Sequence, residues 1–229
     1  MEKYKCELVE MLVKAGVLTF GDFTTKSGRK TPYFINTGNF KSGAYLEKLG
    51  EFYAKTIYKS LGCEFDALFG PAYKGIPLVS AAAMSLYRLY GIDKPYCFNR
   101  KETKDHGEGG MTVGYKPKEK DRIVIVEDVV TAGTAVRETV ELFRNIADVS
   151  FVGLIVLADR CERGTGSMSA LDELENCLGI RVFPIINIYD ILDYLYNREI
   201  DGKIYIKDEE KAKIEQYLQA YGAKTRSPA

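Results

Sequence analysis

The sequence predicts an α/β protein whose mainly parallel central sheet is flanked by helices, with a small N-terminal hood and a flexible β-hairpin lid. From residue 43 onward, short apolar runs alternate with amphipathic segments, an order typical of a parallel sheet covered on both faces. The run 123–126 is β-branched without polar alternation, as in a strand buried on both sides. We therefore expect functional residues at the carboxyl ends of the strands.

The length and charge of the chain limit what it can be. With 229 residues, we expect a single domain over 1–229, large enough for a sizeable core. Its expected parts are a hood over about 1–40, a core over about 41–200, a lid over 100–112 and a C-terminal helix over about 208–221. Lys plus Arg and Asp plus Glu both total 32, so the net charge favours neither a nucleic-acid partner nor an anionic membrane surface.

The cysteines and the beginning of the chain indicate a reducing compartment. The five cysteines are odd in number and widely spaced without a C-x-x-C motif, so we expect reduced, mostly buried thiols and neither disulfides nor a zinc site. No apolar run reaches membrane-spanning length, and the first residues lack the apolar region of a secretion signal. We expect a cytoplasmic protein.

The first 40 residues predict one helix and two strands outside the main sheet. Apolar residues recur at helical spacing over 3–15, and Gly16 follows as a C-cap. The runs 19–24 and 33–37 are strand-like and are separated by a polar turn at 26–30. These two strands would form the hood.

The core elements follow from the same patterns. We expect strands over 65–69, 95–100, 122–127, 151–158 and 181–187. The intervening and final helices are expected over 43–60, 75–90, 134–146, 168–177, 189–196 and 208–221, the last of them capped by Asp208. There is no internal repeat.

The most specific motif follows the strand 122–127. Glu127 and Asp128 would repel a phosphate, but they can accept hydrogen bonds from sugar hydroxyls or ligate a hydrated divalent cation. Gly133 then allows close backbone approach, and a helix beginning at 134 offers unpaired amides to a phosphate. A ribose 5-phosphate suits both the acid pair, through its hydroxyls, and the glycine turn, through its phosphate. Neither common nucleotide-binding fingerprint has acids before the glycine as this segment does. An ordinary buried strand with a capped helix is the alternative.

A second strand-to-helix junction lies at 65–77. Two glycines and Lys74 can form another anion site, and Pro77 suits the first turn of a helix, where its missing amide costs nothing. A tight turn with a surface lysine would look similar. Together with the phosphate site predicted at Gly133 and the start of the next helix, this junction suggests a ligand with two phosphate ends.

The segment 99–110 indicates a mobile basic lid. Arg100, Lys101, Lys104 and His106, the only histidine, are followed by three glycines. Closure of such a loop over a polyphosphate would exclude water from an unstable cationic intermediate. A solvated hairpin tip of mixed charge is the alternative explanation.

Residues 122–135 closely resemble the phosphoribosyl pyrophosphate motif of the type I phosphoribosyltransferases. The string Arg-Lys-Glu-x-Lys-x-His-Gly at 100–107 narrows the resemblance to the orotate-specific branch, as do 23–36, the Pro-Ala-Tyr-Lys-Gly turn at 71–75 and 159–164. The resemblance implies the fold, transfer of ribose 5-phosphate from phosphoribosyl pyrophosphate to orotate in pyrimidine biosynthesis, and Mg2+ as cofactor. It also implies a homodimer whose lid residues reach the partner's site, and a cis peptide bond between Ala72 and Tyr73.

Site residues are carried over by position. Phosphoribosyl pyrophosphate, the donor, would be contacted by Lys26, Tyr73, Lys74, Arg100, Lys101, Lys104, His106, Glu127, Asp128, Val129, Val130, Thr131, Ala132, Gly133, Thr134 and Ala135. Orotate would be contacted by Lys26, Phe34, Ile35, Thr131 and Arg160. The catalytic group would be Lys101, Lys104, His106 and Asp128, and either Lys104 or His106 would protonate the leaving oxygen. No metal ligand is certain, since Mg2+ is expected mainly through the donor and water.

Chemistry supports the choice of base. Orotate has a carboxylate next to its reacting nitrogen, which suits a planar bidentate donor such as Arg160, and uracil and purines lack that group. Two other functions stay open. One is a phosphoribosyltransferase for uracil or a purine, although the hood at 26–36 and Arg160 argue against it. The other is a non-catalytic sensor of the donor in transcriptional control, which would need a basic face and a damaged lid.

Overall fold

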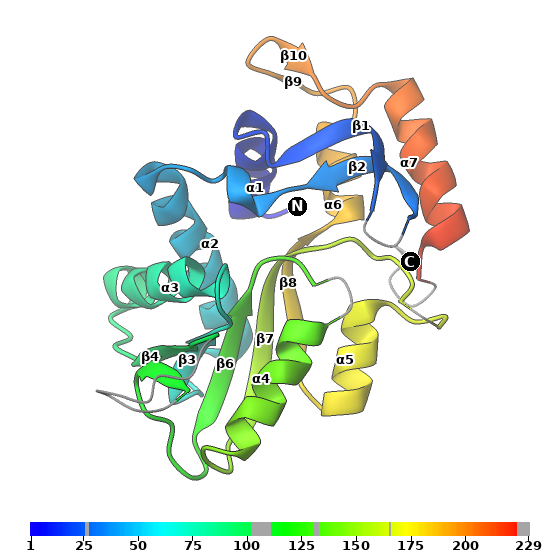
Figure 1. The fold of residues 1–229 in the computed structure, drawn as a ribbon. Coiled ribbons are helices and arrows are strands. Elements are labelled where there is room, and N and C mark those ends of the chain that lie inside the picture. Colours follow the sequence, from blue (N-terminus) through cyan, green and yellow to red (C-terminus); the bar gives the residue numbers. More distant parts are fainter. Residues whose placement is uncertain (26–27, 102–110, 131–132, 165, 224–229) are drawn as a thin grey trace.

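The computed structural model describes residues 1–25, 28–101, 111–130, 133–164 and 166–223. Its main sheet contains β3 (Ala67–Gly70), β4 (Tyr96–Asn99), β5 (Thr112–Gly114), β6 (Arg122–Glu127), β7 (Ser150–Asp159) and β8 (Val182–Asn187). Their order across the sheet is β5-β4-β3-β6-β7-β8, and all neighbours are parallel except β4 and β5. The mainly parallel α/β fold expected from the sequence is confirmed (Figure 1).

Helices cover both faces of this sheet. One face carries α1 (Lys3–Lys14), α2 (Gly43–Leu61), α3 (Gly75–Tyr90) and α6 (Ile188–Leu195), whose apolar side chains pack in one cluster with β6, β7 and β8. The other face carries α4 (Thr134–Arg144) and α5 (Ala170–Leu178). Neighbouring residues of β6 divide accordingly, since Val124 and Val126 belong to the first cluster and Ile125 packs with α4 and α5. The run 123–126 is apolar throughout because both of its faces are buried.

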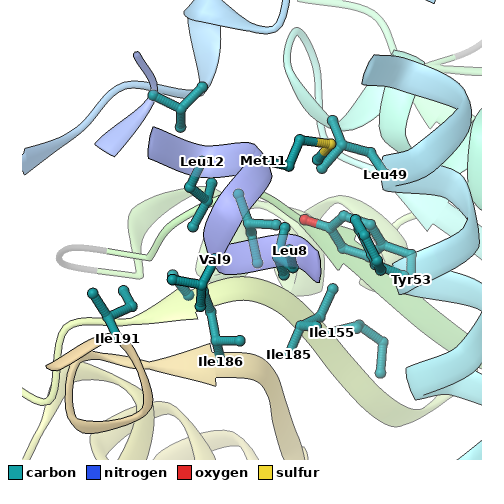
Figure 2. Packing of buried hydrophobic residues seen from close by; sticks show 14 of the residues in the cluster. Leu8, Val9, Met11, Leu12, Leu49, Tyr53, Ile155, Ile185, Ile186 and Ile191 are labelled. Carbon is teal, nitrogen blue, oxygen red and sulfur yellow. The ribbon is translucent and has the colours of Figure 1, made fainter. Parts of the chain in front are cut away.

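The first helix contributes directly to the main core. In Figure 2, Leu8 and Val9 of α1 lie beside Ile155 of β7 and Ile185 of β8, and Tyr53 of α2 lies nearby. Leu8 and Val9 are fully buried. By sequence this helix is grouped with the hood, but its apolar side chains belong to the main core, next to which the hood lies.

The hood strands form a separate two-stranded antiparallel sheet. They are β1 (Leu18–Thr24) and β2 (Lys30–Ile35), followed by the short 3-10 helix η1 (Thr37–Asn39). The C-terminal helix α7 (Asp208–Tyr221) packs against β2 (Figure 1). The hood is therefore held between the core and the C-terminal helix α7.

Several local expectations differ from the structure. The second hood strand begins at Lys30, inside the expected turn, and ends at Ile35. A hairpin of β9 (Glu199–Ile200) and β10 (Lys203–Ile204) was not expected from the pattern, because two-residue strands have no periodicity. Asp208 is the first residue of α7 and not its cap. The Asp208 carboxylate accepts a hydrogen bond from the Tyr196 hydroxyl, and the Glu210 carboxylate accepts one from the backbone N–H of Lys207.

The thiols also differ from expectation. All five cysteines are thiols, but only Cys97 and Cys161 are buried, and Cys63 and Cys177 are exposed. The expectation of mostly buried thiols is therefore wrong. The helices among the described residues include none with the length and apolar character needed to cross a membrane.

Candidate active site

The site lies where the strand order of the sheet reverses. β3 and β6 are neighbours, but the chain leaves β3 through α3 on one face and leaves β6 through α4 on the other. A crevice opens at the carboxyl ends of strands at such a point, and ligands of α/β proteins bind there. The turn after Gly70 and the acid pair after Val126 meet in this crevice.

Asp128 joins three segments of the chain. Its carboxylate Oδ2 accepts a hydrogen bond of 2.6 Å from the Thr37 hydroxyl and one of 2.8 Å from the Lys74 ammonium. Thr37 comes from η1 next to the hood, and Lys74 from the turn after β3. Asp128 is only 6% exposed, so its carboxylate is fixed before any ligand arrives.

Glu127 is held differently. Its backbone carbonyl accepts a 2.6 Å hydrogen bond from the hydroxyl of Tyr53, which is fully buried in α2, and its carboxylate accepts the backbone N–H of Asp128 at 3.0 Å. Sequence analysis missed both Tyr53 and Thr37. No signal marks them, because Tyr53 matches the apolar face of a helix and Thr37 is one polar residue in a loop.

The two neighbouring carboxylates have opposite pKa shifts. Burial raises the pKa of Glu127 to about 7, and the nearby charge of Asp128 adds to this effect. Burial alone would also raise the pKa of Asp128, but the hydrogen bonds from Lys74 and Thr37 outweigh it and lower that pKa. Near neutral pH, Asp128 is thus a charged acceptor, whereas Glu127 holds its proton more readily than an ordinary carboxyl group.

We expect the stability of the protein to fall between pH 4.5 and 7 through Glu127. In this window the folded protein keeps a proton that the unfolded chain, with the ordinary pKa of 4.5, has released. The full loss is about 3 kcal/mol, complete above pH 7. Urea unfolding at several pH values should show this slope in the natural protein and a flatter one in Glu127→Gln, which keeps the acceptor oxygen. Equal slopes would contradict the shift.

The expected phosphate cradle begins with Val129 and Val130, both partly buried, and ends at the first turn of α4. Gly133 has φ +71°, and a Cβ there would come within 2.7 Å of the end of the Leu174 side chain, so any other residue would strain the backbone and displace that leucine. Thr134 and Ala135 are the first residues of α4, where backbone amides lack helical partners. Thr131 and Ala132 lie outside the described residues.

The turn after β3 is tightly built. A Cβ on Gly70 would overlap the carbonyl of Gly75, and the Asn99 side chain of β4 accepts the backbone N–H of Ala72 at 2.7 Å. The peptide bond between Ala72 and Tyr73 is cis, as the resemblance implies. Tyr73 and Lys74 are exposed beside Asp128, and these three residues help line a cleft of about 490 Å³ that reaches Thr37 and Ser42.

The expected lid is described only at its ends. Asn99 of β4 pairs with Thr112 of β5 in antiparallel register, and the backbone N–H of Arg100 donates to Met111. Lys101 lies 3.7 Å from Glu138 of α4, which places the first lid residues near the phosphate cradle. Lys104 and His106 lie outside the described residues.

The residues expected to bind orotate occupy two faces of the hood. The ring of Phe34 stacks on Phe23 at 5.6 Å, and Ile35 is partly buried. Tyr33, the residue before Phe34 in β2, is fully buried and points to the opposite face, where the Arg160 guanidinium lies 4.4 Å from its ring centre. The ring of Phe34 and Arg160 therefore do not converge. Lys26 and Thr131 lie outside the described residues.

Comparison with known proteins agrees with this architecture. Residues 36–170, more than half of the chain, match the model of the phosphoribosyl transferase domain. The chain belongs to the phosphoribosyltransferase family.

Individual relatives narrow the class to one activity. The orotate phosphoribosyltransferase of Clostridium acetobutylicum is 52% identical over 98% of this chain and 100% of its own length. The orotate phosphoribosyltransferase of Lachnoclostridium phytofermentans is 50% identical over 97% of this chain and 99% of its own. The crystal structure of orotate phosphoribosyltransferase from Francisella tularensis superposes with a TM-score of 0.81 at 37% identity, covering 94% of this chain and 99% of that one.

Proposed function

We infer that this chain is an orotate phosphoribosyltransferase, which transfers ribose 5-phosphate from phosphoribosyl pyrophosphate to orotate in pyrimidine biosynthesis. The products are orotidine 5'-phosphate and pyrophosphate. Identity of about 50% over the full length to proteins of that name supports the activity. The single structural observation that carries it is Asp128, a buried and charged carboxylate between Lys74 and Thr37, at the end of the strand that leads into the phosphate cradle.

The donor would lie along the crevice. Its 5'-phosphate would bind the backbone amides at 129–135, and its ribose hydroxyls would donate to Glu127 and Asp128. Its pyrophosphate would meet the exposed Tyr73 and Lys74, with Arg100, Lys101, Lys104 and His106 of the lid closing over it. The acid pair would thus contact the sugar, with the two phosphate sites on either side of it.

Orotate would lie between the hood and the end of β7. Because the Phe34 ring is already stacked on Phe23, we favour contact with the base through the backbone of Phe34 and Ile35. Arg160 directly follows β7, the strand beside β6, and so stands at the same edge of the sheet as the acid pair. Lys26 and Thr131 would complete this base site.

Catalysis would come mainly from holding and neutralising charge. Transfer at the anomeric carbon passes through an oxocarbenium-like state, which needs an oriented ribose and a stabilised leaving group. Asp128 would orient the ribose, and the lysines at 74, 101 and 104 would stabilise the departing pyrophosphate. Either Lys104 or His106 would deliver a proton to the leaving oxygen.

The chain fits a Mg2+ ion that arrives with the donor. Among the described residues, His, Cys, Asp and Glu do not gather in groups of three or more that could hold a metal ion. Mg2+ commonly keeps several waters and binds substrate phosphates with one or two carboxylates, and Glu127 and Asp128 can supply these. When bound, the ion would neutralise pyrophosphate charge.

We also propose that the enzyme acts as a homodimer with lid residues shared between subunits. The exposed face of α3 supports this, since it presents the large apolar side chains of Met84 and Tyr87, with Tyr73 just before the helix. Large exposed apolar side chains that gather on one face are typical of a protein interface. The face adjoins the turn that carries Lys74.

One assay separates the candidate functions. We expect orotate absorbance to fall only when phosphoribosyl pyrophosphate and Mg2+ are both present, with uracil and purine bases inactive under the same conditions. Activity with uracil alone would contradict the proposed base. Binding of the donor without release of pyrophosphate with any base would point to a sensor.

A further inference from the structure

We propose that Glu162 is a positioning residue for the base site, which orients Arg160 and ties the C-terminal helix to the binding of orotate. This inference rests on the proposed function, in which Arg160 contacts orotate. Glu162 has no role in the activity as described so far. Its surroundings, however, connect the hood, the end of β7 and α7.

Glu162 determines which face of Arg160 is free. Its Oε1 accepts a hydrogen bond of 2.8 Å from Nε of Arg160 and lies 2.5 Å from Nη2 of the same arginine. Nη2 also donates to the hydroxyl of Thr31 at 3.1 Å. The two side chains are only 12% and 14% exposed. Among the described residues no hydrogen bond joins Nη1, which is therefore the part of the guanidinium left for a substrate.

This geometry refines the expectation that Arg160 binds orotate as a bidentate fork. One edge that can form such a fork, Nε with Nη2, is already occupied by Glu162, and the other, Nη1 with Nη2, is limited because Nη2 also donates to Thr31. Arg160 would instead present the two hydrogens of Nη1. Its orientation is set by Glu162 and by the ring of Tyr33 beneath it.

The same carboxylate also sets the local charge. Oε2 of Glu162 lies 3.4 Å from Nη1 of Arg29, so one carboxylate serves two guanidinium groups. The hydroxyl of Tyr33 donates to Oε1 at 3.1 Å. These four side chains carry one net positive charge, which suits an anionic base. Without Glu162, Arg160 would be a nearly buried cation with no counter-charge in the cluster.

The C-terminal helix supports this cluster through its last turn. The backbone N–H of Arg163 donates to Tyr221 at 2.8 Å, and that of Ala223 donates to Cys161 at 2.8 Å. The rings of Tyr217 and Tyr33 pack in a T-shaped arrangement with centroids 6.0 Å apart. The segment 160–163 is therefore clamped between the hood and α7. In this proposal α7 and the residues just after it have a role in substrate binding.

The test compares KM for orotate with KM for phosphoribosyl pyrophosphate in the variant Glu162→Gln. This change keeps an acceptor oxygen but removes the charge that orients Arg160. We expect KM for orotate to rise about tenfold or more, while KM for phosphoribosyl pyrophosphate changes by less than about twofold. Glu64→Gln is the matched control, because Glu64 pairs with Arg122 at 2.8 Å on an exposed surface. The control should leave both constants unchanged.

Each outcome decides the matter. An unchanged KM for orotate, or an equal rise for both substrates, would overturn the proposal, since a merely structural role would not single out the base. If Glu162→Gln does not fold, Tyr217→Leu is used, and a rise of about threefold or more for orotate alone is expected. An unchanged value there would also overturn it. If the natural protein uses uracil instead of orotate, the proposed function fails, and this is seen before any variant is made.

Discussion

Replacing Asp128 by asparagine should lower kcat/KM by about a hundred- to a thousandfold, the range for removing a preorganised polar contact at a reacting centre. The side chain keeps its size, so the fold should survive. The amide loses the charge that pairs with Lys74 and can accept ribose hydroxyls only weakly. Both the resting site and the bound ribose are affected, which makes this the largest expected effect of a single atom change.

Initial rates with orotate and phosphoribosyl pyrophosphate measure the Asp128→Asn effect, and circular dichroism checks the fold. Thr37→Val provides a graded companion, because it removes one of the two donors to Asp128 but keeps the charge. A loss of about tenfold is expected there, corresponding to one hydrogen bond to a charged group. If Asp128→Asn retains near-normal turnover in a folded protein, the ribose does not depend on this carboxylate.

Replacing Lys101 or Lys104 by alanine should lower kcat by orders of magnitude, about a hundredfold or more, with an intact fold. These cations would stabilise the charge that develops on the departing pyrophosphate, which is greater in the transition state than in the bound donor. The Lys101 side chain is 42% exposed and paired only loosely with Glu138, so its loss leaves no buried charge behind. Single-turnover rates separate this effect from product release.

Lys3→Ala is the matched control, since the side chain of Lys3 is 93% exposed and lies in the first helix. Near-normal turnover in both lid variants would contradict a catalytic lid. Mixing Lys101→Ala protein with Asp128→Asn protein tests the shared site. Hybrid dimers should recover part of the activity if the lid of one subunit serves the other, and no recovery is expected if each subunit is self-contained.

The parts of the fold that were predictable are those encoded locally. The run 122–127 matches β6 residue for residue, and 75–90 matches α3, because a buried parallel strand and an amphipathic helix each leave a pattern in consecutive residues. The turn at 71–75 and the acids at 127–128 could be placed in one crevice by the rule that parallel strands end at the same edge.

The contacts that organise the site could not be predicted in this way. Thr37 is 91 positions from Asp128, and Tyr53 is 74 positions from Glu127. Glu162 lies in a segment that the family resemblance covers, yet its two arginine partners depend on how the hood closes over the end of β7. Pairings between remote segments depend on the assembled fold, and periodicity carries no information about them. The short strands β9 and β10 were missed for lack of length.

The pairing of Lys74 with Asp128 has a consequence for selectivity. In the empty site each group already neutralises the other, so an anion that lacks sugar hydroxyls could recruit Lys74 only by leaving a buried carboxylate uncompensated. In the proposed site, phosphoribosyl pyrophosphate would satisfy both groups in one exchange, because its pyrophosphate would attract the ammonium while its hydroxyls replace that ammonium at the carboxylate. On this reasoning the crevice would favour a ligand that carries both a phosphate and a diol over free phosphate or pyrophosphate.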